Sequence, residues 1–277
     1  MMPPAARSSL LAAAFLATLG LPAGAEQAAL PSAVVGIDLL PGWREPGGAR
    51  VAAIELRLAP GWHTYWRVPG DSGIPPQFDW SASENLAGVT YEWPRPGVFE
   101  SFGEAMFGYA DALVLPVVLT PERPDAPIEA RVDVLFGLCN DICVPVAARL
   151  EARIEPSAPA DGREKIERAL ADRPVGAKAA GVTRARCSLG AGATGATLTA
   201  EIDFAAPPPP GVAAVIEADR PDLWIGVPQT RVEGRRLRAV APVESASGSG
   251  VALDRGGLRL TLIDPRRAID IRGCASG

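Results

Sequence analysis

Cys139 and Cys143, which are separated by three residues, are the pair of side chains whose type and spacing best support chemistry in this chain. They follow an apolar run and close a ring of five residues. In the chain-entropy model such a ring contributes about 2 kcal/mol, against about 4.5 kcal/mol for the much larger ring between Cys187 and Cys274. This difference corresponds to roughly 50 mV in reduction potential. The sequence therefore predicts a redox-active pair at Cys139 and Cys143 and a structural disulfide between Cys187 and Cys274.

Four cysteines permit three pairings. Only the pairing of Cys139 with Cys143 and of Cys187 with Cys274 keeps each bridge within one predicted domain. Residues four apart on an ideal strand are separated by about 13 Å. A disulfide needs roughly 4.4 to 6.8 Å between Cα atoms, so the chain must turn between Cys139 and Cys143. An unbroken register places Cys139 on a face with Asp133 and Cys143 on a face with Arg149, so both sulfurs point away from the core. The alternative interpretation is a strained but inert hairpin disulfide.

The charges near the cysteines predict the direction of reactivity. Asp141 lies inside the ring, and no Lys, Arg or His lies within five residues of either cysteine. Nothing local in the sequence therefore lowers a thiol pKa. We expect the pair to be attacked by a partner's thiolate, and to pass electrons on through mixed disulfides.

The N-terminus indicates an oxidising compartment. Arg7 precedes a short apolar segment from Leu10 to Leu19, and Ala23-Gly24-Ala25 has the small residues of a cleavage site. We interpret residues 1–25 as a secretory signal peptide, with a mature periplasmic protein beginning at Glu26. Disulfides persist in that compartment.

Composition excludes several classes of function. The formal net charge is −5, and no basic cluster is interleaved with aromatic residues, so we expect no nucleic-acid partner. The chain has a single histidine, His63, which excludes sites with several histidine ligands. We interpret His63 as a surface or hydrogen-bonded residue; a Cu(I) site with Met106 and the cysteines, or a proton-transfer role, is the minor alternative. We predict no metal and no cofactor.

The 29 Gly and 28 Pro, spread between short apolar runs, favour an all-β fold. We predict two β-sandwich domains, at 26–155 and 181–277, joined by a linker with a short helix at 156–180. Asp161 and Glu164 resemble a capping box for that helix. The predicted elements are a strand over Ile54–Leu58, a structured loop over Gly61–Trp80, a strand over Leu113–Leu119 with Pro116 at an edge or bulge, a hairpin around the cysteines, and strands over Ala196–Phe204, Ala213–Ala218, Leu223–Val227, Arg235–Val243 and Leu258–Ile263.

Four strings carry a family resemblance: GWHTYWRVPGDSGIPPQFDW, WPRPGVFESFG, GYADALVLPV and LFGLCNDICVP. In this order they resemble the amino-terminal periplasmic domain of the thiol:disulfide interchange protein DsbD, and more closely its ScsB-type relatives. The resemblance covers roughly residues 30–155. It implies an immunoglobulin-like fold whose cysteine pair takes electrons from a membrane electron transporter of the DsbD or CcdA type and reduces periplasmic thioredoxin-fold proteins.

The same resemblance implies site residues. Cys139 and Cys143 match the redox pair, and the segment Phe99 to Gly103 matches an aromatic cap loop over the disulfide. The residues implied as cap or lining are Phe99, Phe102, Tyr65, Trp66 and Tyr109.

This chain departs from the DsbD pattern in having only three residues between the cysteines, and it carries neither the transporter nor the thioredoxin-like segment. We therefore expect a separate soluble module acting as a protein-disulfide reductase component. The alternative function is a non-catalytic β-sandwich module, in copper handling or cytochrome maturation, whose disulfides only stabilise it.

Overall fold

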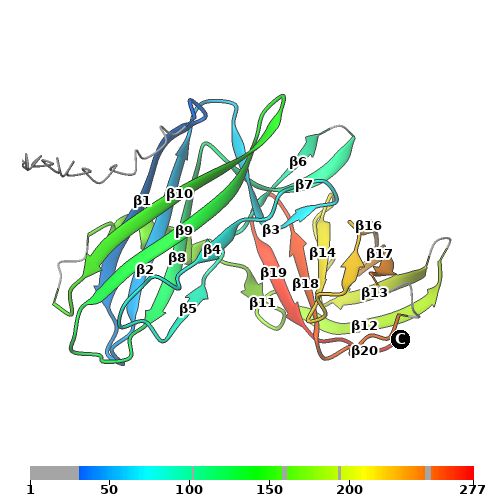
Figure 1. Ribbon diagram of the computed structural model, residues 1–277. Coiled ribbons are helices and arrows are strands. Elements are labelled where there is room, and N and C mark those ends of the chain that lie inside the picture. Colours follow the sequence, from blue (N-terminus) through cyan, green and yellow to red (C-terminus); the bar gives the residue numbers. More distant parts are fainter. Residues whose placement is uncertain (1–30, 102, 158–160, 193–194, 247–250) are drawn as a thin grey trace, which may run out of the picture.

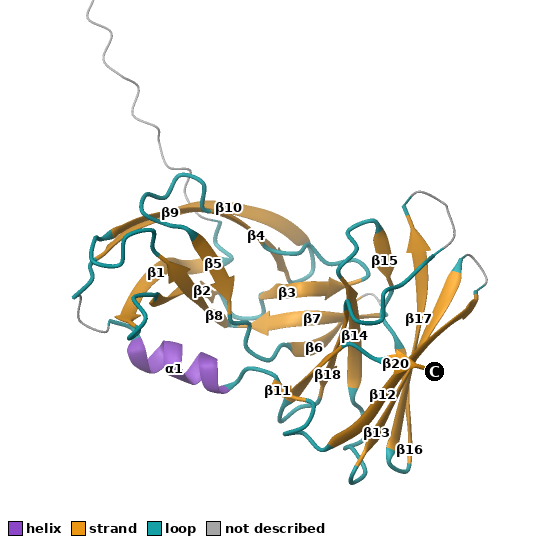
Figure 2. Cartoon of the chain, turned by 90° about the horizontal axis from the view of Figure 1, so that it is seen from below, coloured by secondary structure: helices purple, strands orange, loops and turns teal. Residues whose placement is uncertain are grey.

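The computed structural model describes residues 31–101, 103–157, 161–192, 195–246 and 251–277. The expected signal peptide at 1–25 lies outside the described residues. The described chain consists of strands β1 to β20 and one helix, α1, which confirms the all-β expectation (Figures 1 and 2). No helix in these ranges is long and apolar enough to cross a membrane.

Strands β1 to β10 form an N-terminal sandwich of two sheets. One sheet has the order β1 (Val34–Arg44), β2 (Arg50–Leu58), β8 (Ala112–Thr120), β5 (Gly88–Tyr91). The other has the order β10 (Cys143–Ile154), β9 (Ile128–Cys139), β3 (His63–Gly70), β7 (Glu104–Ala110), β6 (Gly97–Ser101), with β4 (Gln77–Asp79) paired to β9.

Strands β11 to β20 form a C-terminal sandwich. One sheet has the order β11 (Val175–Gly176), β19 (Ala268–Arg272), β18 (Leu258–Ile263), β14 (Ala213–Ala218). The other has the order β15 (Leu223–Ile225), β17 (Arg236–Ser245), β13 (Ala196–Phe204), β12 (Val182–Ala191), β20 (Ala275–Ser276), with β16 (Gln229–Glu233) paired to β17. Their apolar faces share one buried core that includes Ala200, Ile216, Leu237 and Leu260.

The core of the N-terminal sandwich follows from the period of two along its strands. Val132, Val134, Phe136 and Leu138 alternate along β9, and all four are buried in one cluster with residues of the facing sheet such as Leu115. Successive side chains of a strand point to opposite faces. The residues between these four therefore lie on the outer face of the sheet.

The prediction of a loop over Gly61–Trp80 is wrong, because this segment contains β3 and β4. Its Gly, Pro and aromatic residues are typical of a loop, whereas the strand is defined by pairing with β7 and β9, which are distant in sequence. The expected bulge at Pro116 is absent, because Pro116 pairs with Ala53 in a regular register. On the other side of β8 the pairing with β5 covers only Val117–Thr120, so Pro116 lies one position beyond its end.

Helix α1 (Arg163–Ala171) begins after Gly162, whose φ of 74° is left-handed, and no side chain caps it. The predicted capping box of Asp161 and Glu164 is therefore absent. A glycine supplies the turn into the helix without the cost of a Cβ. The helix is held instead by Ile166, which is fully buried against Val51.

The two sandwiches meet at β3. Val215, Ile263 and Ala268 of the C-terminal sandwich join the same buried cluster as the N-terminal core. Arg67 of β3 makes a two-point ion pair with Glu217, with N to O distances of 3.0 and 2.7 Å. Figures 1 and 2 both show β3, β6 and β7 beside β14 and β18. The C-terminal sandwich thus supports the strand that lies between β9 and β7.

Replacing Glu217 by Gln is expected to destabilise the protein by roughly 1–3 kcal/mol, because the Arg67 side chain, 15% exposed, keeps its charge and loses its carboxylate. Chemical denaturation measures this change. Asp222→Asn is the matched control: its pair with Arg220 is more exposed, at 39% and 45%, and contributes about 0–1 kcal/mol. Equal stability of the two variants would contradict a supporting role for the Arg67 pair.

Candidate functional site

The disulfide between Cys139 and Cys143 joins the ends of β9 and β10, with 4.1 Å between the Cα atoms. The two cysteines are directly opposite each other, and the register continues without a shift to Ile154 and Ile128. Cys139 is fully buried, whereas Cys143 is exposed and the neighbouring Ile142 is 64% exposed. The two sulfurs therefore differ in how an incoming thiol reaches them.

Both cysteines lie on the outer face of the sheet, away from the main core, as the unbroken register predicts. Cys139 is nevertheless buried, because a second small cluster covers it there. This cluster contains Tyr65, Met106 and Cys139, with Ile74 packed against them. The outer face at this point is a shielded layer rather than an open surface.

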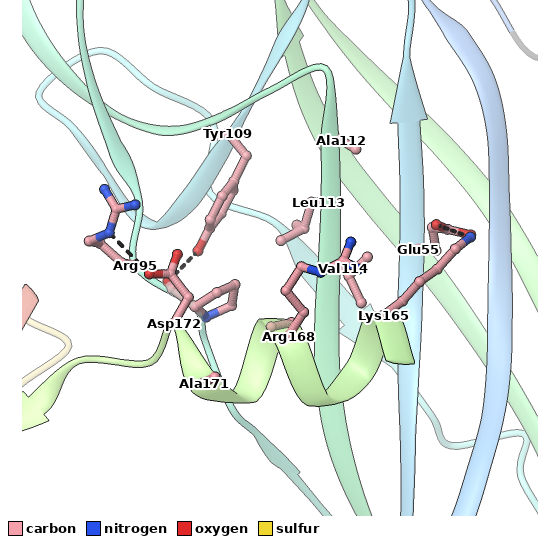
Figure 3. Close-up of a pocket in the computed structure, with 12 residues that line it drawn as sticks. Glu55, Arg95, Tyr109, Ala112, Leu113, Val114, Lys165, Arg168, Ala171 and Asp172 are labelled. Carbon is pink, nitrogen blue, oxygen red and sulfur yellow. Dashed lines mark hydrogen bonds and ion pairs between the residues drawn. The ribbon is translucent and has the colours of Figure 1, made fainter. Parts of the chain in front are cut away.

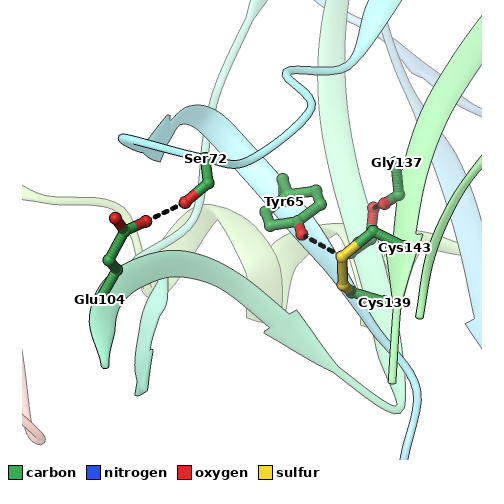
Figure 4. Close-up of a disulfide and its surroundings, with 7 residues drawn as sticks. Tyr65, Ser72, Glu104, Gly137, Cys139 and Cys143 are labelled. Carbon is green, nitrogen blue, oxygen red and sulfur yellow. Dashed lines mark hydrogen bonds between the residues drawn. A yellow bond between two sulfur atoms is a disulfide. The ribbon is translucent and has the colours of Figure 1, made fainter. Parts of the chain in front are cut away.

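Tyr65 lies against the disulfide from β3. Its side chain is fully buried, and its hydroxyl oxygen is 3.2 Å from Sγ of Cys143 (Figure 4). Burial raises the pKa of Tyr65, so the phenol keeps its proton at neutral pH. The hydroxyl is therefore available as a hydrogen-bond donor to Cys143.

Two glycines make room for the Tyr65 ring. A Cβ at position 137 would lie 2.8 Å from Cδ2 of Tyr65 and 2.6 Å from Cβ of Ile74. A Cβ at position 73 would lie 2.9 Å from Cδ1 of the same ring. All three distances are shorter than carbon–carbon contact allows. The missing side chains of Gly73 and Gly137 thus allow Tyr65 to reach the disulfide.

His63 is the cross-strand partner of Cys139 in the β3–β9 pair. Its ring stacks on Phe99 at 5.1 Å and meets the Tyr65 ring edge-on at 5.9 Å. Its Nε2 atom is buried and has no hydrogen-bond partner. Burial lowers the pKa of His63, which favours the neutral imidazole. The interpretation of His63 as a surface or hydrogen-bonded residue does not describe this Nε2.

Trp66 and Tyr109 do not line the disulfide, which corrects the expectation for both. Each lies in the main core, because alternation along β3 and β7 turns it to the inner face. The Tyr109 hydroxyl donates to the carbonyl of Pro94 at 2.8 Å. Tyr109 also lines a cavity of about 680 Å³ between α1 and β8, where Lys165 pairs with Glu55 (Figure 3). None of the residues that line this cavity belongs to β9 or β10, the strands that carry the cysteines.

Of the two rings expected in the cap, Phe99 lies on β6 and reaches the site through its stacking on His63. Phe102 lies outside the described residues. The β6–β7 hairpin is also tied to the segment after β3 by a hydrogen bond from Ser72 to Glu104 (Figure 4). The cap segment and β3 are therefore one connected unit.

The second disulfide joins Cys187 and Cys274, which are 87 positions apart in sequence, with 5.7 Å between the Cα atoms. Cys187 is buried in the core of the C-terminal sandwich, and the bridge ties β12 to the C-terminal segment. For the described residues, no group of three or more His, Cys, Asp or Glu side chains has the geometry to hold a metal ion.

Sequence reasoning missed the position of His63 opposite Cys139 and the contribution of Gly137. The alternation in His63-Thr64-Tyr65-Trp66 is a signal that a strand was possible, with His63 and Tyr65 on one face. No local pattern shows that position 137 must lack a side chain, because the ring it accommodates comes from a strand about 70 positions away.

Together the fold and the site define a β-sandwich domain with a half-shielded disulfide at the end of one hairpin. Residues 38–154 match the family model described as thiol:disulfide interchange protein DsbD, N-terminal. This part of the chain is therefore a DsbD N-terminal-type domain of the thiol:disulfide interchange family.

The solved structures extend the fold comparison to the C-terminal sandwich. The crystal structure of the N-terminal periplasmic domain of ScsB from Proteus mirabilis has a TM-score of 0.64 at 22% identity, covering 84% of this chain and 91% of that one. At this identity the likeness shows the fold. The reduced DsbD N-terminal domain of Neisseria meningitidis gives a TM-score of only 0.27 at 13% identity, covering 44% of this chain and 85% of that one. No curated protein matches the chain significantly.

Replacing Gly137 by Ala is expected to displace Tyr65 or Ile74, because the new Cβ would overlap both. Overpacking of this kind costs roughly 1–3 kcal/mol in the free energy of unfolding. The displaced ring would also expose the disulfide, so reduction by dithiothreitol should become faster. Gly88→Ala is the control, since nothing lies within 4 Å of its Cβ position in β5. Unchanged stability and reduction rate in Gly137→Ala would show that the ring does not depend on this space.

Proposed function

We propose that this protein is a thiol:disulfide electron carrier in which Cys139 and Cys143 cycle between disulfide and dithiol. The observation that carries the proposal is the asymmetry of the pair: one cysteine is exposed, its bonded partner is buried beneath a small cluster of side chains, and both lie outside the main core. In the second bridge, by contrast, the less buried cysteine, Cys274, is still packed against the core of the C-terminal sandwich. The family match of residues 38–154 supports the same chemistry.

The exposed position of Cys143 supports an order of steps in which this cysteine is attacked first. A donor thiolate attacks Sγ of Cys143, a donor–Cys143 disulfide forms, and the Cys139–Cys143 bond breaks with its electron pair on Cys139. A second donor thiolate then attacks the donor sulfur, which releases Cys143 and leaves the donor oxidised. Two electrons have entered the pair, and uptake of two protons gives the dithiol.

Electron delivery reverses these steps with a different partner. The Cys143 thiolate attacks an acceptor disulfide and forms a mixed disulfide. Cys139 then attacks Sγ of Cys143, which restores the intramolecular bond and releases the reduced acceptor. We propose a membrane electron transporter of the DsbD or CcdA type as donor and thioredoxin-fold proteins as acceptors, with the reaction in the periplasm. The family match and the fold shared with a periplasmic ScsB domain support these assignments.

The reduction potentials of the two disulfides test the carrier against the alternative of a non-catalytic module. We expect the Cys139–Cys143 potential to lie above about −300 mV, the limit below which structural bridges typically fall, and the Cys187–Cys274 potential to lie below it. Redox titration with separate detection of each pair by alkylation and mass spectrometry measures both. A Cys139–Cys143 potential in the structural range would favour the non-catalytic module.

Trapping tests the order of attack. Cys139→Ala leaves the exposed Cys143 without its resolving partner, so it should accumulate a mixed disulfide with an oxidised thioredoxin-fold protein. Cys143→Ala leaves only the buried Cys139 and should accumulate at least tenfold less. Non-reducing electrophoresis quantifies both adducts. Equal yields would contradict the role given to burial, and no adduct from either variant would contradict the carrier.

Replacing Tyr65 by Phe removes the hydroxyl beside Cys143 and keeps the ring. Because a hydrogen bond to a charged group contributes about 1.5–3 kcal/mol, the Cys143 thiolate should form less readily. We expect the Cys143 pKa in the reduced protein to rise by about one unit or more, measured by the pH dependence of iodoacetamide alkylation in the Cys139→Ala background. Tyr91→Phe, whose hydroxyl accepts from Trp80, is the control. An unchanged Cys143 pKa would show that the Tyr65 hydroxyl does not stabilise the thiolate.

A further inference from the structure

One side chain beside the disulfide has no part in the steps above. His63 lies directly opposite Cys139 in the β3–β9 pair. Side chains of directly opposed residues have Cβ atoms about 5 Å apart on the same face of the sheet. The imidazole is held in place by the stacked Phe99 and by the edge of Tyr65. Its buried Nε2 makes no hydrogen bond while Cys139 is oxidised.

The proposed cycle requires a group beside Cys139 that can accept and donate a proton. Cys139 is fully buried, and burial in apolar surroundings disfavours a thiolate. Yet Cys139 must leave as a thiolate when the disulfide opens and must attack as a thiolate when it closes. A buried thiol can meet both requirements only if a neighbouring group exchanges a proton with it.

Resting on the proposed function, we infer that His63 is the group that takes the proton from Cys139 before disulfide closure and returns it after disulfide opening. The inference joins two observations, the cross-strand register and the unpartnered Nε2. In a neutral imidazole one ring nitrogen accepts a hydrogen bond, and an S–H group is a weak donor. The reduced pair would therefore supply the partner that Nε2 lacks in the oxidised state.

The proton and electron balance is simple. During closure the S–H bond of Cys139 breaks, an N–H bond forms on His63, and the sulfur electron pair forms the bond to Sγ of Cys143. The two electrons leave with the acceptor's thiolate. After closure the imidazolium releases its proton to solvent. During opening the bond electrons return to Cys139, His63 takes up a proton from solvent, and this proton transfers to the Cys139 sulfur. His63 changes only its protonation, and no further oxidant or reductant is needed.

The surroundings of His63 favour this role. Its titratable neighbours on the same face are Tyr65 and the two cysteines, while β6 and β7 present the uncharged Phe99 and Ala110. Glu100 follows Phe99 and alternates to the other face of β6. Burial alone accounts for the lowered pKa of His63. The base form is therefore favoured at neutral pH and is lost as the pH falls through a pKa that is lower than the ordinary value of histidine.

A reduced protein mixed with a chromogenic aromatic disulfide separates the two cysteines in one measurement. The first thiolate is released when Cys143 attacks the reagent, and the second when Cys139 displaces the mixed disulfide. The ratio of the second rate to the first isolates the step assigned to His63. We compare the parent with His63→Phe, which keeps a ring to stack on Phe99, and with Trp224→Phe, an exposed ring of the C-terminal sandwich, as control.

We expect His63→Phe to lower this ratio about 100-fold at pH 7, in the range of general base catalysis. In the parent, the second rate should reach a plateau above the pKa of His63. In the variant it should keep rising with pH, because Cys139 must then ionise directly. Added imidazole should restore part of the rate in His63→Gly, a variant that leaves space for it.

An unchanged rate ratio with an unchanged pH profile in His63→Phe would overturn the role of His63. So would a slow second phase that keeps the parent's plateau in His63→Phe, together with no rescue of His63→Gly by imidazole. Neither result would contradict the proposed function as an electron carrier. Failure of the carrier has a different signature, namely a parent protein that releases no thiolate at all, or a potential in the structural range.

Discussion

The pairing of β3 between β9 and β7 is the constraint on which the rest of the site depends. This strand places His63 opposite Cys139 and Tyr65 opposite Gly108, and it turns Thr64 and Trp66 to the inner face. The Thr64 hydroxyl fixes the register by donating to the carbonyl of Gly137 at 3.0 Å. A slip of one residue would exchange the two faces and bring Thr64 and Trp66 to the disulfide.

The shielding of the disulfide is built on the outside of the sandwich, separately from its core. The main core is filled by the inward residues of β9, and the layer over Cys139 is a small cluster around Tyr65 and Met106. A small cluster of this kind can move without opening the core. For the proposed carrier, this separation means that Cys139 can become exposed in a redox step while the sandwich stays folded.

The C-terminal sandwich has a physical connection to the same strand. β3 loses its regular register with β7 after Tyr65, and Arg67 then pairs with Glu217. Beyond the strand, Asp71 accepts a hydrogen bond from the backbone N–H of Val227 at 2.9 Å. The far end of β3 is thus anchored on a second folded body, which limits the freedom of the end that faces the cysteines.

The sequence by itself determined the all-β class, the strands over Ala196–Phe204, Ala213–Ala218 and Leu258–Ile263, and the cysteine hairpin. All of these depend on local periodicity and on turn residues, which neighbouring positions carry. The sequence also picked out Tyr65 and Phe99, through the resemblance to DsbD. It assigned Trp66 and Tyr109 to the same site, because a list of aromatic residues does not say which face of a strand each one occupies.

Only the tertiary structure decided that Cys139 is the buried partner and Cys143 the exposed one, and that a histidine 76 positions before Cys139 lies beside it. The absence of a nearby positive charge in the sequence predicted that nothing local would lower a thiol pKa. Strand pairing brings in a titratable ring from outside that window. The physical reason is that the register between distant strands is set by how whole faces bury their apolar side chains, a quantity that no short stretch of sequence contains.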